Sequence, residues 1–541
     1  MADEVKTEGP VTGDDHADLD LIDAPPDPVA HMRQIIEDLV KAEAAELAGK
    51  GPGPKEERKL PAKFVEQCLY ANELGDGTLY AAVNHGRFLY LKNSAAWYRW
   101  TGHYWERDVM DTAMAAVEGV VDVFLDELVT VQSKERAALK SNDKGEAAKQ
   151  HRKAAAITRR VSKLRSDRGR NACLKFSHTI KSPIALRGDE FDENPWLMAV
   201  ENGVVDLRTG ELRKGKPGDL ISKACPHKWI DIEAPAPAWE KRYLAKTFEE
   251  YPDIIPFLQR LLGYAITGLT DEHVFTVLYG QGRNGKTVLI ETLLHVLGPL
   301  ASPIQSEMLL DQGRSRSAAA PSPDIMALKG LRIAFASETD EDRKFSASRV
   351  KWLSGADTLV GRAPHDKLET HFRPTHALFL TTNNKPHASA FDFAFWERVL
   401  LIPFTLSFVN REPQAANERR ADLKLQQALE AEASGILAWL VRGCIEWQRQ
   451  GLNPPAIVKE MTLSYRREED LIQDFIDARC YVAETACSTA ANLYEAFSTW
   501  FEANVSKRGM SQKKFGRLMR LKGFEKVKRG VYEYQGIGLQ V

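Results

Sequence analysis

A glycine-rich loop between a strand-like run and a helical run restricts the folds open to the middle of this chain. Residues 273–279 are apolar and strand-like, residues 280–287 read Gly-Gln-Gly-Arg-Asn-Gly-Lys-Thr, and residues 288–297 are typical of a helix. Glycines let backbone N–H groups approach a phosphate, and the helix start adds a favourable dipole. The pattern is that of a P-loop, whose lysine reaches the β and γ phosphates of a nucleotide and whose last hydroxyl ligates Mg²⁺. The residues expected to hold the nucleotide are Gly280, Gln281, Gly282, Arg283, Asn284, Gly285, Lys286 and Thr287.

A P-loop fold needs further strands that carry a catalytic acid and a group that senses the γ-phosphate. Two strand-like runs downstream fit: one ends at Glu338, with Asp340 close behind, and the other ends at Asn383. An acid at such a strand end can orient and deprotonate the attacking water, and an asparagine can hold that water or the γ-phosphate. The order of these residues after the loop predicts that Lys286, Glu338 and Asn383 share one catalytic site.

These motifs resemble those of the phage and plasmid primase-helicase C-terminal ATPases of helicase superfamily 3, a family with poxviral relatives. The resemblance covers residues 64–541 and is most specific over 279–404. The family's motif A is similar to residues 280–287, motif B to 336–338, the intermediate motif to 351–362, motif C to 382–386, and the Trp-x-Arg before an Ile-Pro-Phe strand to 396–404. The order of these motifs along the chain makes the resemblance specific.

The resemblance implies an AAA+-like ATPase that uses ATP and Mg²⁺, assembles as a hexameric ring and translocates on DNA. In such rings an arginine of one subunit completes the nucleotide site of its neighbour, and Arg398 is the candidate here. A salt bridge from Arg398 to Glu397 or to another acid is the structural alternative. Many P-loop enzymes carry a magnesium-organising acid where this chain has Ser337. The expected metal ligands are Thr287, Glu338 and Asp340, and the choice between the two acids stays open.

A strand, a turn and a second strand are expected over residues 358–372, projecting from the ATPase core. The resemblance implies a DNA-contacting hairpin here that lines the channel of the ring. Lys367 near the tip can grip a backbone phosphate and be pulled as the nucleotide state changes. An exposed lysine in a surface loop is the alternative. The expected DNA-binding residues of the core are Lys351, Arg362 and Lys367.

Two further segments carry an excess of positive charge. Within residues 134–170, thirteen lysines and arginines stand against four acids in a proline-free run of good helix formers, which predicts a long basic helix or a helical pair. A nucleic-acid-binding surface and a merely solvated helix face are both open for this segment. Residues 490–541 have the order of a winged helix, and DNA-binding cations are expected on its second helix at Lys513, Lys514 and Arg517.

The chain is expected to be a multidomain protein with an α/β core. An acidic, mostly disordered tail is expected at 1–60, an α+β module with the basic helical segment at 61–240, the P-loop ATPase core at 241–415, a helical lid and connector at 416–482, and a winged-helix DNA-binding domain at 483–541. A mean hydropathy of −0.35 argues against a membrane span. Six cysteines without a C-x-x-C pattern predict reduced thiols and no structural zinc.

Two classes of function are compatible with these features. The first is an ATP-dependent DNA helicase of phage or plasmid replication, acting on single-stranded and forked DNA in the bacterial or phage-infected cytoplasm. The second is a non-unwinding DNA-binding ATPase that serves as a replication initiation or loading factor. We expect no polymerase-type primase site, because the region before Phe64 is short and lacks a cluster of paired acids and histidine. Primer synthesis would then need a separate primase or polymerase chain.

Overall fold

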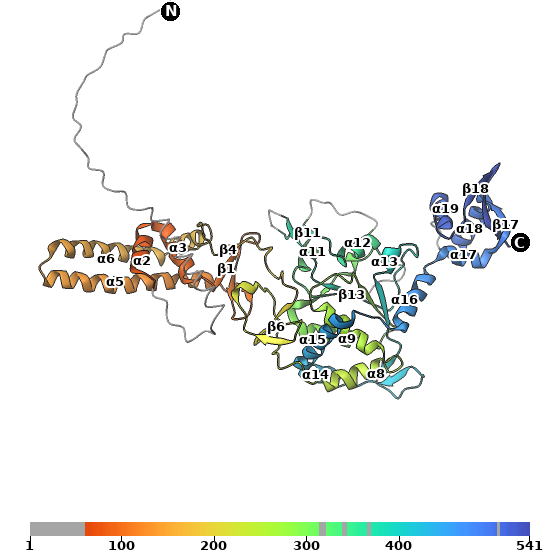
Figure 1. Cartoon of the computed structure of the whole chain (residues 1–541), viewed down its shortest axis with the longest axis horizontal. Coiled ribbons are helices and arrows are strands. Elements are labelled where there is room, and N and C mark those ends of the chain that lie inside the picture. The colour runs from red at the N-terminus through yellow and green to blue at the C-terminus, as the bar shows by residue number, and fades with distance from the viewer. Residues whose placement is uncertain (1–59, 313–320, 338–342, 365–368, 506–508, 541) are drawn as a thin grey trace, which may run out of the picture. The chain divides into compact units, whose positions relative to one another are not determined.

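The computed structural model describes residues 60–312, 321–337, 343–364, 369–505 and 509–540 (Figure 1). It is a mixed α/β multidomain protein, as expected, and its contacts divide it into two compact units. The first unit holds the described residues 60–88 and 109–185, and the second holds 89–108 and 186–540. The tail expected at 1–60 lies outside the described ranges apart from Leu60. Within those ranges no helix is long and apolar enough to cross a membrane.

The first unit is helical. Its helices are α2 (Ala62–Tyr70), α3 (Asn72–Val83), α4 (Thr112–Ala115), α5 (Val117–Lys140), α6 (Lys144–Leu164) and α7 (Asp167–Ser177). Helices α5 and α6 lie side by side as a long hairpin (Figure 1). The Asp143 side chain caps α6 by accepting a hydrogen bond from the Glu146 N–H. Phe124 of α5 and Ile157 of α6 are fully buried, so the helical pair predicted for this segment is confirmed.

Two small sheets precede the central sheet along the chain. The first has the order β3-β2-β1-β4 and consists of β1 (Phe88–Leu91), β2 (Ala96–Trp100), β3 (Trp105–Arg107) and β4 (Ala185–Leu186). The second is an antiparallel meander of β5 (Leu197–Val200), β6 (Gly203–Asp206) and β7 (Glu211–Arg213). Gly102 lies in the turn between β2 and β3, with a φ of 112°.

A five-stranded parallel sheet forms the centre of the second unit. Its order is β14-β8-β13-β10-β9, with β8 (Phe275–Tyr279), β9 (Ala301–Ile304), β10 (Ile333–Ser337), β13 (Ala377–Thr382) and β14 (Val399–Pro403). The strands β8, β10 and β13 are buried along almost their whole length because helices cover the sheet, among them α9 (Ile254–Ala265) and α10 (Lys286–Leu297). The register pairs Tyr279 with Thr382 and Ser337 with Thr381. The carboxyl ends of β8, β13 and β10 therefore meet at one edge.

Helix α11 (Pro323–Ala327) precedes β10, and the segment between β10 and β13 adds α12 (Ala347–Leu353) and an antiparallel hairpin. The hairpin pairs β11 (Leu359–Gly361) with β12 (Thr370–Phe372), which confirms the two predicted strands. Its tip, with the expected DNA-contacting residue Lys367, lies outside the described residues. The short helix α13 (Phe393–Trp396) then leads into β14.

The prediction of a helical lid from residue 416 is wrong at its start. Residues Glu418–Arg420 form strand β16, which pairs in parallel with β15 (Ser407–Val409). The Glu418 carboxylate accepts hydrogen bonds from the Arg411 guanidinium at 2.5 Å and from the Gln414 N–H at 2.7 Å. These bonds close a turn between β15 and β16, so the chain is not helical here. Helical structure begins only with α14 (Leu425–Ala431) and α15 (Ala433–Gln450).

The C-terminal part of the second unit begins after α15. Its elements are α16 (Ala456–Glu468), α17 (Leu471–Arg479), β17 (Cys480–Thr489), α18 (Ala490–Asn504), α19 (Gln512–Leu521), β18 (Lys526–Arg529) and β19 (Val531–Leu539). The strands form an antiparallel sheet with β19 in the centre. Phe475, Phe497, Phe515 and Tyr534 form its own apolar core. Two helices followed by a strand pair occur in the predicted order.

Candidate functional site

The loop between β8 and α10 turns tightly against neighbouring backbone. Gly285 has a φ of 89°, in the left-handed region, and directly precedes the first residue of α10. A Cβ at Gly280 would lie 2.2 Å from the Asn284 amide nitrogen and 2.4 Å from the Phe404 carbonyl oxygen, so no larger residue fits there. The first amides of a helix have no partner within the helix, and here they face the carboxyl edge of the sheet. This is the arrangement that binds a phosphate.

The side chain of Lys286 joins this loop to the end of β13. Its Nζ donates hydrogen bonds to the Gly280 carbonyl oxygen at 2.5 Å and to Asn383 Oδ1 at 3.0 Å. Only 6% of Lys286 is exposed, and this burial lowers the pKa of its amine to about 8. An anion at the same place favours the charged amine. The structure thus brings together two predicted residues that lie 97 positions apart in the sequence.

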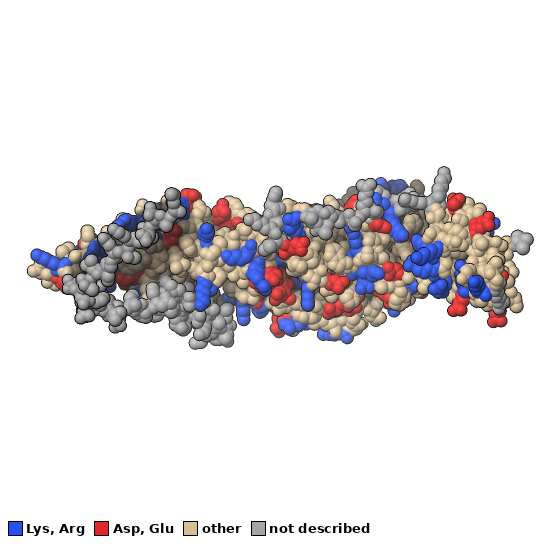
Figure 2. All heavy atoms as spheres, turned by 90° about the horizontal axis from the view of Figure 1, so that it is seen from above, with Lys and Arg blue, Asp and Glu red and all other residues tan. Residues whose placement is uncertain are grey.

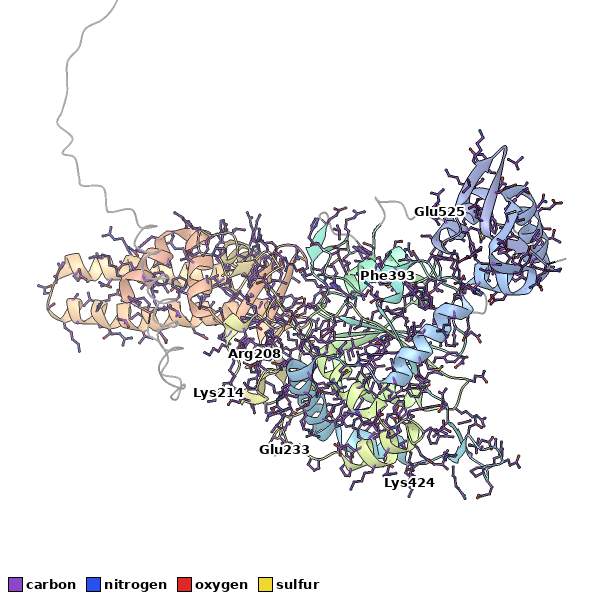
Figure 3. The ribbon with its side chains drawn as sticks, turned by 45° about the vertical axis from the view of Figure 1, so that its right-hand side comes forward. Arg208, Lys214, Glu233, Phe393, Lys424 and Glu525 are labelled. Carbon is purple, nitrogen blue, oxygen red and sulfur yellow. The ribbon has the colours of Figure 1, made fainter. Side chains whose placement is uncertain are left out.

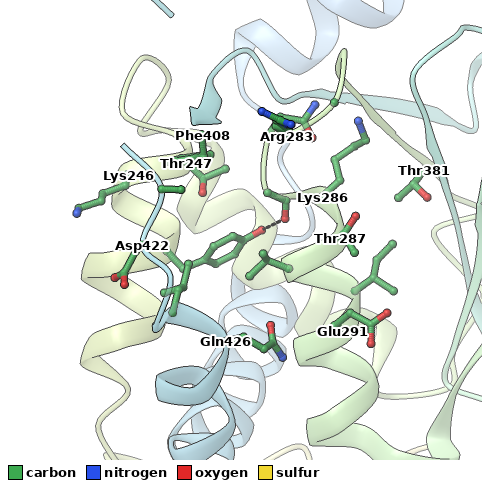
Figure 4. Close-up of a pocket in the computed structure, with 18 of the residues that line it drawn as sticks. Lys246, Thr247, Arg283, Lys286, Thr287, Glu291, Thr381, Phe408, Asp422 and Gln426 are labelled. Atoms are coloured by element: carbon green, nitrogen blue, oxygen red, sulfur yellow. Dashed lines mark hydrogen bonds between the residues drawn. The ribbon is translucent and has the colours of Figure 1, made fainter. Parts of the chain in front are cut away.

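A cavity of about 760 Å³ opens beside the loop (Figure 4). Lys286 and Thr287 lie on one side of it, with Thr381 of β13 and Ser337 at the end of β10. Glu338 and Asp340, the predicted catalytic and metal-organising acids, lie outside the described residues. Asn383 also lines the cavity, so of the four predicted catalytic residues the structure places Lys286 and Asn383 in it.

The opposite wall comes from residues for which the sequence offered no motif. Tyr243 of the π-helical turn η2 (Ala238–Leu244) donates a hydrogen bond from its hydroxyl to the Gly285 carbonyl oxygen at 3.1 Å. Burial raises the pKa of Tyr243, so the hydroxyl remains a donor. Arg242 forms an ion pair with Asp422 at 2.7 Å, across 180 positions of sequence. The hydrogen bond from Tyr243 holds the P-loop, and the ion pair joins two distant segments of this wall.

The charges around the cavity favour an anionic ligand. Five cations line it against two acids: Arg242, Lys246, Arg283, Lys286 and Arg420 against Glu291 and Asp422. Because Asp422 is already paired with Arg242, the remaining charge is positive. Apolar surface from Val288, Phe408 and Leu423 completes the lining. The cavity therefore combines a phosphate cradle with space for an apolar, planar group.

The residues that follow Asn383 are clamped by the end of α16, a feature that sequence reasoning missed. The Nζ of Lys385 lies 2.8 Å from the Glu468 carboxylate and over the rings of Tyr279 and Tyr465, at 5.0 and 5.5 Å from their centroids. The Tyr465 hydroxyl donates a hydrogen bond to the Pro386 carbonyl oxygen. The lysine is thus held between an acid and two aromatic rings. These contacts join the end of β13 to the helix that leads into the C-terminal part.

Arg398 lies at the other edge of the sheet. Its carbonyl oxygen accepts a hydrogen bond from the Phe275 N–H at 2.7 Å, at the start of β8, and its Nη1 donates to the Ala394 carbonyl oxygen at 2.7 Å. At about 3.3 Å per residue, the length of β14 separates Arg398 from the P-loop edge by roughly 16 Å. It forms no ion pair with Glu397 or with any other described acid. Arg398 therefore does not line the cavity of its own chain.

Two of the predicted DNA-binding residues of the core, Lys351 and Arg362, have intramolecular partners. Lys351 of α12 forms an ion pair with Asp392 at 3.0 Å, and Asp392 also caps α13. Arg362 follows β11, and its backbone N–H donates to the Ser322 hydroxyl at 3.1 Å. This ion pair links α12 to α13, and the contact of Lys351 with DNA stays a prediction.

Helix α19 separates its apolar and basic side chains onto different faces. Phe515, Leu518 and Met519 are buried, whereas the predicted residues Lys513, Lys514 and Arg517 are exposed. These three cations line a groove of about 650 Å³ together with Arg520 and Lys526. Partial burial lowers the pKa of Lys514, and the nearby charges of Lys344 and Arg517 act in the same direction. The structure thus brings the predicted cations together on one surface.

Comparison with known proteins agrees with the resemblance that the motifs carry. Residues 78–249 match the family model described as "D5 N terminal like". "Putative helicase L207/L206" of Acanthamoeba polyphaga mimivirus is 28% identical over 437 residues, which cover 78% of this chain and 45% of that protein. "Putative helicase 022R" of Frog virus 3 (isolate Goorha) is 25% identical over 404 residues, which cover 62% of this chain and 41% of that protein.

The chain spans less than half the length of these relatives. Among solved structures, the apo form of the NrS-1 C-terminal region is similar with a TM-score of 0.34 and 12% sequence identity, over 64% of this chain and 100% of that chain.

Proposed function

We propose that this chain is an ATP-dependent DNA helicase of superfamily 3 that acts in DNA replication. The observation that carries the proposal is the position of Lys286, whose amine bridges the P-loop carbonyl of Gly280 and the side chain of Asn383 beside a positively lined cavity. A triphosphate in the cavity replaces these partners of the amine, so the γ-phosphate end lies next to Asn383. The names of the viral relatives support helicase activity.

Mg²⁺ fits the donors at this site. The Thr287 hydroxyl faces the cavity at the start of α10, and hydroxyl and carboxylate oxygens are ligands that Mg²⁺ takes. In the proposal Thr287 and an acid, Glu338 or Asp340, hold the ion, which supplies charge neutralisation at the phosphates. Glu338 accepts a proton from the attacking water, and Asn383 orients that water or the γ-phosphate.

The proposed motor is an AAA+-like hexameric ring. Arg398 lies at the sheet edge opposite the P-loop, which supports a role in the nucleotide site of a neighbouring subunit. The C-terminal elements form a winged-helix domain in this proposal, with α19 as the helix that contacts DNA. Single-stranded DNA passes through the ring, and forked DNA is the substrate that the ring unwinds.

A fork-unwinding assay tests the proposal. The protein with ATP and Mg²⁺ is expected to release the labelled strand of a forked duplex, and single-stranded DNA is expected to stimulate ATP hydrolysis. A non-unwinding initiation or loading factor is the second candidate, favoured by the separate basic surface on α19. DNA-stimulated hydrolysis without strand release at any ring-forming concentration would select that second candidate.

The basic face of α19 is expected to bind DNA phosphates. Replacing Lys513, Lys514 and Arg517 with alanine removes three exposed cations and leaves the buried face of α19 unchanged. DNA affinity at about 100 mM salt should fall roughly tenfold or more, and the slope of log K against log salt should become shallower by about 2. Fluorescence anisotropy over a salt series measures both. An unchanged slope would indicate that the groove docks a protein.

The clamp on Lys385 is expected to support turnover, because it holds the backbone next to Asn383. The Lys385→Met variant keeps the apolar stem and loses the contact with Glu468 and the cation–π contacts. ATP turnover should fall roughly three- to tenfold, equivalent to about 0.7–1.4 kcal/mol, with little change in ATP affinity. Lys459→Met, at an exposed position of the same helix α16 that supplies Glu468, is the matched control. Equal turnover in the two variants would contradict the role.

A further inference from the structure

The first unit divides the cations of the basic segment into two groups. Five of the thirteen lysines and arginines within 134–170 form ion pairs with acids of the same unit. These pairs hold the helices together: Lys153 contacts Glu127 at 2.9 Å, and Arg160 contacts the buried Asp76 at 3.2 Å. Lys163, Arg165 and Arg170 are paired in the same way with Glu73 and Glu118.

The other eight cations are exposed and form no ion pair with any described residue. They are Lys134, Arg136, Lys140, Lys144, Lys149, Arg152, Arg159 and Arg168. Blue side chains mark the end of the hairpin at the left of Figure 2. Exposed positive charges without partners repel one another, which costs stability unless an anionic partner is present.

The four acids of this segment have local partners. Glu135 contacts His151 at 2.9 Å, Asp143 caps α6, Glu146 accepts a hydrogen bond from Gln150 at 2.6 Å, and Asp167 accepts one from Asn171 at 3.0 Å. A solvated helix normally carries pairs of opposite charge four residues apart. Helix α6 has no such ion pair among the described residues. The pattern therefore differs from that of an ordinary solvated face.

Three of the unpaired cations share one face of α6. At 100° per residue, Lys149, Arg152 and Arg159 lie within an arc of about 80°, and they span about 15 Å along the helix. Alanines fill positions 154–156 between them, so little bulk stands beside the cations. Phosphates of one DNA strand follow one another every 3.4 Å or so along the duplex axis. Three cations over this length can each reach a separate phosphate.

We infer that this face of the α5–α6 hairpin binds the phosphate backbone of nucleic acid. It is a contact surface of the first unit, and it consists of residues other than those of the P-loop cavity and of α19. The inference shares with the proposed function the premise that the chain binds DNA, but it requires neither ATP hydrolysis nor unwinding. Partners are recognised by charge and spacing, since no Phe, Tyr or Trp stands among these cations for base stacking.

The test replaces Lys149, Arg152 and Arg159 with alanine in the full chain. Alanine favours helix, so α6 is expected to persist, and circular dichroism with thermal melting checks this. Binding to a labelled single strand and to a duplex of equal length is measured from about 50 to about 200 mM salt. The affinity for at least one of the two should fall roughly tenfold or more at low salt, with a slope shallower by about 2.

Two control variants separate the local effect from a general loss of charge. Alanine at Lys214, Lys216 and Lys241, exposed lysines of the second unit of which Lys214 is labelled in Figure 3, removes the same charge and should leave the slope at the parent value. The variant with Lys149→Arg, Arg152→Lys and Arg159→Lys keeps the charges and should bind like the parent.

The inference is overturned if the alanine variant binds both DNAs with the affinity and the salt slope of the parent protein. It is also overturned if the control variant at Lys214, Lys216 and Lys241 loses as much DNA affinity as the alanine variant. If the protein binds DNA through this face without ATP and shows no ATPase activity, only the proposed function is contradicted. The single-strand and duplex arms identify which form of DNA the face contacts.

Discussion

The Lys286→Ala protein is expected to remain folded and to lose ATP hydrolysis by roughly a hundred- to a thousandfold, because one preorganised donor to a charged phosphoryl group is worth about that much. The amine is buried, and burial already disfavours its charge in the free protein, so its removal should change stability little. Thermal melting and a phosphate-release assay under saturating ATP measure the two quantities separately.

Lys246→Ala is the matched control for this result. Lys246 lines the same cavity from α8 (Ala245–Thr247), on the wall across from Lys286 (Figure 4). If general positive charge were enough, the two variants would lose similar activity. The proposed geometry predicts a modest change in KM for Lys246→Ala and a loss of kcat for Lys286→Ala. Hydrolysis by Lys286→Ala near the parent rate would show that the cavity is not the site of ATP hydrolysis.

The sequence predicted the part of the site whose geometry depends on residues close together in the chain. A P-loop needs glycines, a lysine and a hydroxyl at fixed offsets between a strand and a helix, so residues 280–287 could be assigned to one loop without knowing the fold. The meeting of Lys286 with Asn383 was predictable because parallel strands bring their carboxyl ends to one edge. Both inferences depend on backbone geometry that a short stretch of sequence determines.

The remaining wall of the cavity depends on packing between distant segments. Tyr243, and the ion pair of Arg242 with Asp422, carry no spacing signal, because their partners lie 42 and 180 positions away in the sequence. Lys385 illustrates the same limit: a lysine beside Asn384 looks like a surface cation until Tyr465 and Glu468 of α16 surround it.

The basic hairpin shows what tertiary pairing adds to a charge count. In the sequence its thirteen cations are equivalent, and a solvated face was as acceptable as a binding surface. The acids that neutralise five of them, among them Glu73, Asp76 and Glu118, lie outside the basic segment. Only the fold distinguishes cations that stabilise the unit from cations that remain available to a partner.

Arg398→Ala is expected to lower ATP turnover by roughly a thousandfold, the usual worth of an arginine that stabilises a transferring phosphoryl group. The side chain contributes one hydrogen bond, to the Ala394 carbonyl oxygen, so the variant should still fold. Since Arg398 lies at the start of β14 and the P-loop lies beyond the end of β8, the two cannot meet within one subunit. Glu397→Ala, at the exposed neighbouring position, is the control and should retain activity.

Mixing two inactive proteins tests whether this role is exercised between subunits. Arg398→Ala supplies an intact P-loop and Lys286→Ala supplies an intact arginine, so about a quarter of the head-to-tail interfaces in an equal mixture contain both. Limited hydrolysis should therefore return on mixing, once co-purification of differently tagged chains has shown that subunits exchange. Full activity of Arg398→Ala alone would remove the assignment and leave Arg362 or Arg349 to be tested. Exchange without recovery at any mixing ratio would argue against a role in trans, because a single restored interface has every group that the proposed reaction requires.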